Sequence, residues 1–412
     1  MHAASRALPS VIAGANGVCQ IRASMDLRFG AEQEQFRLEA RRWLEAHVPS
    51  GAGRLPSLDT AEGFEAHRRW ERAMFEDHWS VVAWPERYGG RAVGLLEWLV
   101  FEEEYYRARA PTRVGQNGIF LLAPTLFEFG TDEQKDRYLP PMASGEEIWC
   151  QGWSEPDAGS DLAAIRSRGE RRGGDWVVNG QKTWCSRGAF ADWLFGLFRT
   201  DPAAERHRGL TYFLVPMDAP GVTVRPIAQL DGETGFAEVF FDDVVVPDAQ
   251  VLGQVDRGWE VAMATAGSER GLSLRSPARY SEAAARLLDL YERGRDRHPV
   301  RAARLADDVA RALVDAEAYR LHTYWTATRV LAGGTVGAEA SMNKVFWSET
   351  DLAIHRTALA MLGPEAELLD DHERPQEWLD GFLFALAGPI YAGTNEIQRN
   401  VVAERVLGLP RS

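Results

Sequence analysis

Glu269 stands in a setting that suits proton transfer. It lies in the predicted helix GWEVAMATAGSERGLSL (258–274), and no basic residue stands three or four positions away from it. The usual partner of a helical glutamate on a protein surface is therefore missing. Helical spacing puts it on one face with Val261, Thr265 and Leu272, so we expect a partly desolvated carboxylate with a raised pKa. A raised pKa suits a general base whose conjugate acid must persist near neutral pH.

Two other glutamates are weaker candidates for such a base. Glu155 lies in the loop WSEPDAGSD directly before Pro156, and a loop carboxylate in this position is more often a structural hydrogen-bond acceptor. Glu396 lies in YAGTNEIQRN near the end of the sequence, and Arg399, three residues later, offers it a local ion pair. Glu269 is therefore the carboxylate best suited to exchange a proton.

Several common reaction centres are absent from the sequence. No G-x-G-x-x-G follows a predicted strand and no G-x-x-x-x-G-K-[ST] occurs, so the usual dinucleotide and phosphate loops are missing. The three cysteines are far apart, which argues against a zinc site and favours a reducing cytoplasm. A net charge of −14 with scattered basic residues makes nucleic acid a poor partner. No apolar run approaches the roughly 20 residues that span a bilayer, so we expect no membrane segment. The cysteine pattern predicts a cytoplasmic protein.

The chain alternates between helical and β-rich patterns. Amphipathic helices are predicted for residues 25–147, with turns at VVAWPERYGG and YLPPMASGEE, where proline and glycine gather. Between residues 148 and 252, short runs such as DWVVNG, LTYFLVP and AEVFFDDVVVP predict five or more strands. The segment VVNGQKTW predicts a hairpin with its turn at Asn179 and Gly180. From Gly258 onward, helices rich in Ala, Leu, Arg and Glu return.

These patterns predict one large layered fold with three parts. Residues 1–24 are expected to be an extension outside the fold, or to precede the true start at Met25. Residues 25–147 form the N-terminal helical domain, 148–252 the middle β domain and 253–412 the C-terminal helical domain.

Long segments of the chain resemble the acyl-CoA dehydrogenase family. The stretch WCQGWSEPDAGSDLAAIRSRGERRGGDWVVNGQKTWCSRGAFADW (149–193) resembles the flavin-binding signature of that family, and YAGTNEIQRNVVAERVLGLP (391–410) resembles its carboxy-terminal signature. WPERYGG and FGTDEQKDRYLPPMASGE are typical of its amino-terminal domain. The likeness runs from about Met25 to Pro410, and several long motifs in the same order make it specific.

The resemblance implies a fold, a reaction and partners. The implied fold is α+β, with an all-α N-terminal domain, a middle β-barrel or sheet domain and a C-terminal four-helix bundle. FAD would lie between the β domain and the bundle. The implied reaction removes the α and β hydrogens of an acyl-CoA or carrier-bound acyl thioester, with a carboxylate taking the α-proton and flavin N5 taking the hydride. An electron-transfer flavoprotein is the implied acceptor, and the implied assembly is a homotetramer or dimer.

The resemblance also assigns site residues one by one. Trp153 and Ser154 match backbone and hydroxyl contacts to the flavin ring, and Gly159 lets the loop approach a flat ligand closely. Trp184 would stack beside the ring system, and Ser186 would offer its hydroxyl to flavin N5 or O4. The implied cofactor-binding residues are Gln151, Trp153, Ser154, Trp184, Cys185, Ser186, Thr394 and Glu396. The implied substrate-binding residues are Ser160, Ala392 and Gly393.

Ala392 departs from the commonest family pattern, in which the catalytic glutamate lies between the Tyr and Gly of a Y-E-G-T run. The backbone N–H of Ala392 resembles one of two donors that polarise the thioester carbonyl, the other being a ribityl hydroxyl of the flavin. A minority of the family, including enzymes resembling isovaleryl-CoA dehydrogenase, carries the base on the central helix directly before an arginine. Glu269 and Arg270 match that pair. The resemblance therefore implies Glu269 as the base and Arg270 as the residue that orients it or the substrate.

Two segments leave part of the cofactor site unassigned. YERGRDRHPVRAARL (291–305) and LAMLGPEAELL (359–369) stand where the family often has R-x-x-F-G and Gln-Leu-Gly-Gly stretches that touch the flavin's adenosine half. Two further functions stay open. A non-catalytic partner subunit of a mixed complex predicts little flavin and tight association with a paralogue. A flavin oxidase or monooxygenase on the same fold predicts hydrogen peroxide or an oxygenated product.

Overall fold

The computed structural model describes most of the chain. Within its helices, the side chains of residues 268–270 and 375–376 are outside the description. The described ranges are 29–49, 55–270, 276–338, 340–367 and 375–410.

The N-terminal part is helical because its apolar residues recur at helical spacing. Helix α1 buries Phe36, Ala40 and Leu44, which lie one turn apart on one face. Helix α5 begins with a capping box, in which Thr131 and Gln134 each satisfy a backbone N–H of the other. The helices are α1 (Ala31–His47), α2 (Ala61–Glu76), α3 (Leu95–Arg107), α4 (Ala123–Phe129) and α5 (Asp132–Ala143), with a π-helical turn at Asn117–Leu122 before α4.

One buried carboxylate ties α1 to α3. The Glu104 side chain is only 1% exposed, and it accepts hydrogen bonds from Arg37 at 3.2 Å, Arg41 at 2.9 Å and Arg107 at 2.8 Å. Burial alone would raise the pKa of Glu104. The three arginines outweigh burial and lower the pKa of Glu104 from 4.5 to about 2.

The low pKa of Glu104 predicts an acid-sensitive contribution to stability. A carboxylate whose pKa is lowered by folding stabilises the protein above its unfolded pKa, and this contribution is lost as the pH falls toward about 2. We therefore expect the difference in unfolding free energy between the protein and Glu104→Gln to shrink by about 2 kcal/mol between pH 6 and pH 3. Urea unfolding of both proteins at pH 6 and at pH 3 measures this difference in free energy.

The control for this prediction is Glu45→Gln, because the exposed Glu45 also pairs with Arg107, at 3.5 Å. The free energy of unfolding of this variant should keep nearly the same offset from the parent protein at both pH values. An equal shrinkage in both variants would show that the Glu104 cluster is not the source.

The middle part is one eight-stranded sheet. Its strand order is β6-β7-β3-β2-β4-β5-β8, and β1 pairs in parallel with β4. The strands are β1 (Trp149–Gly152), β2 (Arg168–Arg172), β3 (Asp175–Ser186), β4 (Trp193–Arg199), β5 (Leu210–Pro216), β6 (Val222–Ile227), β7 (Phe236–Val246) and β8 (Val251–Leu252).

The predicted hairpin turn at Asn179 and Gly180 is wrong. Both residues lie inside β3, which pairs with β7 on either side of a bulge between Val178 and Gly180. Gly180 has a φ of +142°, and a Cβ there would overlap the side chain of Ser167, so glycine is required by a close approach rather than by a turn. The hairpin turn lies earlier, between β2 and β3, where Gly173 has a φ of +66°.

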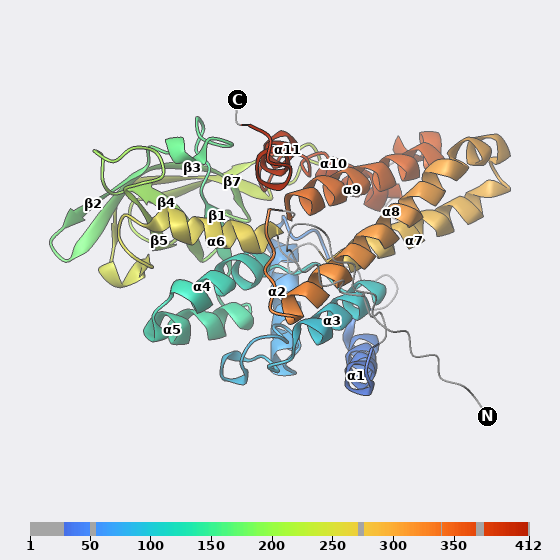
Figure 1. Cartoon of the computed structure of the whole chain (residues 1–412), viewed down its shortest axis with the longest axis horizontal. Coiled ribbons are helices and arrows are strands. Elements are labelled where there is room, and N and C mark those ends of the chain that lie inside the picture. Colours follow the sequence, from blue (N-terminus) through green and yellow to red (C-terminus); the bar gives the residue numbers. More distant parts are fainter. Residues whose placement is uncertain (1–28, 50–54, 271–275, 339, 368–374, 411–412) are drawn as a thin grey trace, which may run out of the picture.

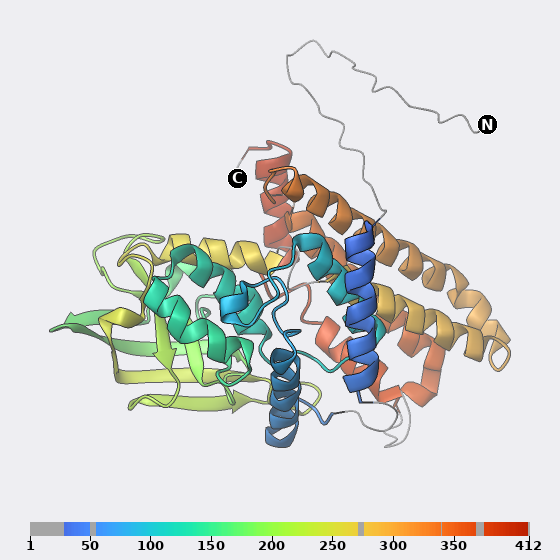
Figure 2. The same cartoon turned by 90° about the horizontal axis from the view of Figure 1, so that it is seen from below.

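The C-terminal part is helical again, which confirms the helical, β and helical order predicted from the sequence. In Figures 1 and 2 the sheet lies at one end of the molecule, the long helices α7 to α9 extend toward the other, and α6 runs beside the sheet toward them. In the described part of the chain, no helix is long and apolar enough to cross a bilayer. The helices are α6 (Gly258–Arg270), α7 (Pro277–Arg295), α8 (Pro299–Leu331), α9 (Ala340–Leu362), α10 (Pro375–Ala385) and α11 (Asn395–Val401).

Candidate active site

Strand β3 breaks its alternation of inward and outward side chains at Trp184. In a regular strand Trp184 would point the same way as Lys182, whose side chain is fully buried. The register between β3 and β7 instead shifts between Lys182 and Cys185, and Trp184 has a φ of +60°. A bulky residue at positive φ is uncommon and costs backbone energy. The bulge turns the indole out of the sheet, where it is 59% exposed and touches the edge of Phe236.

The loop with Trp153 and Ser154 lies directly against this part of β3. The backbone N–H of Thr183 donates to the Ser154 carbonyl at 2.9 Å, and Ser154 is half-buried. Trp153 is buried and packs edge-on against Tyr212 at 6.4 Å between ring centroids. Ser154 therefore lies beside Thr183, the residue directly before Trp184.

A buried ion pair fixes this loop to the strand. Lys182 Nζ lies 2.7 Å from Glu155 Oε1 and also donates to the Trp153 carbonyl at 3.3 Å. Glu155 also accepts hydrogen bonds from the backbone N–H groups of Arg166 at 2.6 Å and Ser167 at 3.0 Å. This confirms Glu155 as a structural acceptor, and it explains why Glu155 is unsuited to be a base.

The two charges of this pair stabilise each other against burial. Burial would raise the pKa of Glu155, but Lys182, the Arg166 N–H and the hydrogen bond from Ser167 lower it overall. Burial lowers the pKa of Lys182, and Glu155 offsets part of that effect. The ring of Phe198 lies 4.9 Å from the ammonium group and leaves it no water on that side.

The end of β3 contacts the N-terminal helices. Ser186 is half-buried, and its carbonyl accepts a hydrogen bond from Asn117 Nδ2 at 3.5 Å. Arg187, next in the chain, donates to the Val114 carbonyl at 2.8 Å. Cys185 points the other way, into the sheet core, and burial raises the pKa of its thiol to about 12. Only the backbone of Cys185 is therefore on the side of Trp184.

Two further predicted residues lie on the same domain with different exposure. Gln151 is half-buried on β1, opposite Phe195 of β4. Ser160 is exposed in the loop after Ser154. The neighbouring Asp161 pairs with Arg206 at 2.8 Å, which joins this loop to the one between β4 and β5.

The C-terminal motif forms a left-handed turn. Ala392 has a φ of +57° and Gly393 a φ of +78°. Thr394 then caps α11, because its side chain accepts the N–H of Ile397 at 3.2 Å. Gln398, whose side chain is fully buried, donates from Nε2 to the carbonyls of Ala392 at 3.2 Å and Gly393 at 3.3 Å.

The start of α11 is anchored to α9. Asn395 accepts hydrogen bonds from Lys344 at 2.8 Å and Ser348 at 3.2 Å, and donates to Glu349 at 3.4 Å. The sequence predicted an ion pair between Glu396 and Arg399, but Arg399 pairs with Glu349 of α9.

Glu396 is exposed at the start of α11. The backbone N–H there, together with the Thr394 hydroxyl, lowers the pKa of Glu396. A lowered pKa makes a carboxylate a weaker base, so the environment of Glu396 does not favour it for proton abstraction.

Helix α6 carries the predicted base at its end. The helix buries Val261, Thr265 and Ala266, and the Thr265 hydroxyl is 2.9 Å from Thr125 Oγ1. Glu269 and Arg270 are its last two residues, and their side chains, like Leu272, lie outside the described part. In Figures 1 and 2 the end of α6 lies near α11, at the junction of the sheet and the C-terminal helices.

Three residues of this site were missed by the sequence analysis. Lys182 is one of only three lysines in the chain, and its place two residues before Trp184 was the available signal. Gln398 stands four residues after Thr394, so helical spacing alone brings its side chain back over the preceding turn. Asn117 gave no signal, because it lies far from Ser186 in sequence.

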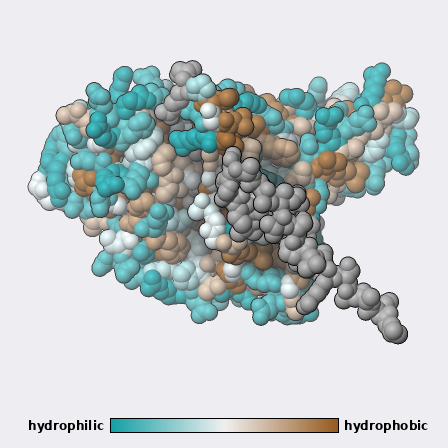
Figure 3. All heavy atoms as spheres, viewed as in Figure 1, coloured by the Kyte–Doolittle hydropathy of each residue, from teal (hydrophilic) through white to brown (hydrophobic). Residues whose placement is uncertain are grey.

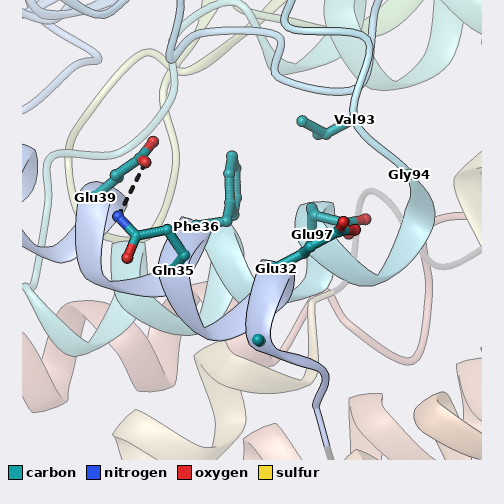
Figure 4. Close-up of a pocket in the computed structure, with 8 residues that line it drawn as sticks. Glu32, Gln35, Phe36, Glu39, Val93, Gly94 and Glu97 are labelled. Carbon is teal, nitrogen blue, oxygen red and sulfur yellow. Dashed lines mark hydrogen bonds between the residues drawn. The ribbon is translucent and has the colours of Figure 1, made fainter.

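A hollow on the N-terminal helices lies apart from these residues. Figure 4 shows it between α1 and the start of α3, with Glu32, Glu39 and Glu97 around Phe36. Arg91 offsets part of this negative charge through its ion pair with Glu39 at 3.2 Å, and Gln35 also donates a hydrogen bond to Glu39 at 3.3 Å. An acidic hollow without a second feature that points to a ligand is assigned no role.

Comparison with known families matches nearly the whole chain. Residues 30–146 match the description "Acyl-CoA dehydrogenase, N-terminal domain", 150–244 the middle domain and 256–407 the C-terminal domain. The three matches follow one another in the order of the helical, β and helical parts.

Individual relatives agree with the family match. The chain is 39% identical over 390 residues to acyl-CoA dehydrogenase IpdE1 of Mycobacterium tuberculosis, covering 92% of this chain and 98% of that protein. A solved structure titled "Tcur3481-Tcur3483 steroid ACAD" has a TM-score of 0.82 at 30% identity and covers 94% of this chain and 100% of that one. The ChsE4-ChsE5 complex from M. tuberculosis has a TM-score of 0.78 at 31% identity, with 94% and 100% covered. The chain therefore belongs to the acyl-CoA dehydrogenase family of FAD-dependent oxidoreductases.

Proposed function

We propose that the protein dehydrogenates an acyl thioester between its α and β carbons, with Glu269 as the base that takes the α-proton. The observation that carries this proposal is Trp184. Its indole is exposed because a strained bulge turns it outward, and the Ser154 carbonyl accepts a hydrogen bond from Thr183, the residue before it. Strained backbone that presents an aromatic side chain is typical of a ligand site rather than of a core.

The described residues fit FAD. We infer that Trp184 covers one edge of the flavin ring, that Ser154 and Ser186 offer hydroxyl groups to its heteroatoms, and that Thr394 contacts it from the C-terminal turn. Gln151 and the backbone of Cys185 complete this side, and Glu396 lies at the rim. When bound, FAD supplies the acceptor for the hydride that leaves the β-carbon.

Proton removal then depends on two parts of this chain. Glu269 follows the buried Thr265 by one helical turn, so the proposal puts its carboxylate on the inward face of α6 with Arg270 orienting it or the substrate. The N–H of Ala392 polarises the thioester carbonyl, which acidifies the α-carbon. Gly393 has no side chain and so leaves room for the substrate beside that turn. Ser160 contacts the acyl-CoA.

The proposed substrate is an acyl thioester. An acyl-CoA fits the family, and a carrier-bound acyl group is the second possible thioester. Because a similar structure is titled a steroid enzyme, ring-containing acyl groups belong in the substrate panel beside linear and branched ones.

An exposed apolar surface near the chain end, together with the family, supports the proposed partners. Large apolar side chains, including Ile390, Leu407 and Leu409, are more than half exposed near the chain end. Figure 3 shows apolar atoms over the region of α10 and α11. Such a patch marks an interface, so we propose a homotetramer or dimer. We also propose an electron-transfer flavoprotein as acceptor and a cytoplasmic location.

Anaerobic mixing of the purified protein with an acyl-CoA panel tests the proposed function. We expect the flavin absorbance to bleach with at least one acyl-CoA. A protein that purifies without FAD and only together with a paralogue would instead support the non-catalytic partner subunit. Hydrogen peroxide, formed with oxygen as the sole acceptor, would support an oxidase.

A further inference from the structure

We propose that Gln398 is a positioning residue that holds the turn at Ala392 and Gly393 with its N–H groups facing the thioester carbonyl. The proposal rests on the proposed function, because it concerns the backbone donor of Ala392. It differs from a general stabilising role in predicting an effect on the polarity of the bound carbonyl.

The hydrogen bonds of Gln398 fix the direction of two peptide groups. Nε2 donates to the carbonyls of Ala392 and Gly393 at 3.2 and 3.3 Å, and the Gln398 side chain is fully buried. In a planar trans peptide the C=O and the following N–H point in opposite directions. Two carbonyls held toward Gln398 therefore turn the N–H groups of Gly393 and Thr394 away from it.

The left-handed backbone extends this arrangement to Ala392 itself. With positive φ at Ala392 and Gly393, successive N–H groups point to one side, as they do along a helical turn. For alanine this conformation is strained, because its Cβ crowds the backbone, so it needs contacts that hold it. Both of the Gln398 bonds are made to the two residues with positive φ, of which Ala392 carries the strain.

Other bonds hold the flanks of the turn and leave these two carbonyls to Gln398. The N–H of Asn395 donates to the Pro389 carbonyl at 2.8 Å, which closes the loop around the turn. The Thr394 side chain caps α11. Loss of Gln398 should therefore free the orientation of the N–H groups while α11 stays in place.

The chain contains a matched control at Gln134. This buried glutamine also donates from Nε2 to two backbone carbonyls, of Ala249 at 2.9 Å and Val251 at 2.8 Å. Its bonds join α5 to Ala249 and to the first residue of β8, away from the C-terminal turn. Gln134→Met therefore removes two similar hydrogen bonds from Nε2, and in addition the capping bond from the Thr131 N–H, without touching the turn.

Infrared spectroscopy of a bound thioester provides the test. The probe is an acyl-CoA with a ¹³C-labelled thioester carbonyl and sulfur in place of the β-carbon, which cannot give up a β-hydride. We expect binding to shift the carbonyl stretch to lower frequency in the parent protein and in Gln134→Met, and the shift to be largely lost in Gln398→Met. With an oxidisable acyl-CoA, the rate of flavin reduction should fall by roughly 10- to 100-fold in Gln398→Met, with less change in substrate KM.

The outcomes separate this proposal from the proposed function. An unchanged infrared shift in Gln398→Met, or an equal loss in Gln134→Met, overturns the role of Gln398 alone. A parent protein that binds the probe without any shift overturns the Ala392 donor as well. If Gln398→Met does not fold, Gln398→Glu keeps the size of the side chain and offers at most one donor, and an unchanged shift in that variant also overturns the proposal.

Discussion

Replacing Glu269 with glutamine is expected to slow reduction of the bound flavin by an acyl-CoA about 10²- to 10⁴-fold, the range for loss of a general base. Glutamine has the size of glutamate but cannot take the α-proton. Glu269 is in the last turn of α6, and the replacement keeps the volume of the side chain, so the fold and the flavin content should be kept. Stopped-flow measurement of flavin bleaching under anaerobic conditions gives the rate.

The control variant for this prediction is Glu260→Gln. Glu260 lies on the same helix in its first turn, is exposed and pairs with Arg257 at 2.8 Å, so its replacement should leave the rate unchanged. The rival assignment is tested with Glu396→Gln. Undiminished bleaching in Glu269→Gln, together with a loss in Glu396→Gln at full flavin content, would move the base to the C-terminal motif.

Replacing Lys182 with methionine is expected to lower the free energy of unfolding by about 3–5 kcal/mol, because it leaves the buried Glu155 carboxylate without its counter-charge. The loop with Ser154 should then separate from β3, and the affinity for FAD should fall with it. Chemical unfolding of the FAD-free protein measures the first effect, and FAD titration measures the second.

A double variant separates charge from packing in this prediction. Adding Glu155→Gln to Lys182→Met removes the unpaired charge, while the amide oxygen still accepts one of the two N–H groups, of Arg166 and Ser167, that the two carboxylate oxygens accept. The double variant should therefore be more stable than Lys182→Met alone. As a control, Lys135→Met breaks the surface pair with Asp132 and should cost less than about 1 kcal/mol. Equal losses for Lys135→Met and Lys182→Met would contradict the argument.

The sequence predicted the parts of the site that are local. The WSEP and YAGTNE motifs and the order of helices and strands are runs of adjacent residues, so spacing and residue type are enough to identify them. Glu155 shows the same, since a carboxylate before proline was expected to accept hydrogen bonds and does so. Local reasoning failed at Arg399, where a neighbour in sequence was expected and a partner from α9 was found.

The sequence by itself determined the family, the order of helical, β and helical parts, and the presence of Ala392 where the commonest family pattern has a glutamate. Only the tertiary structure decided which way the key groups point. Trp184 faces outward because β3 must bulge against β7, and Lys182 faces inward because Glu155 is there to pair with it. The turn at Ala392 is left-handed in a place where Gln398 holds its carbonyls. The direction of these side chains depends on pairing between segments that are distant in sequence. The spacing of residues along one segment therefore cannot predict it.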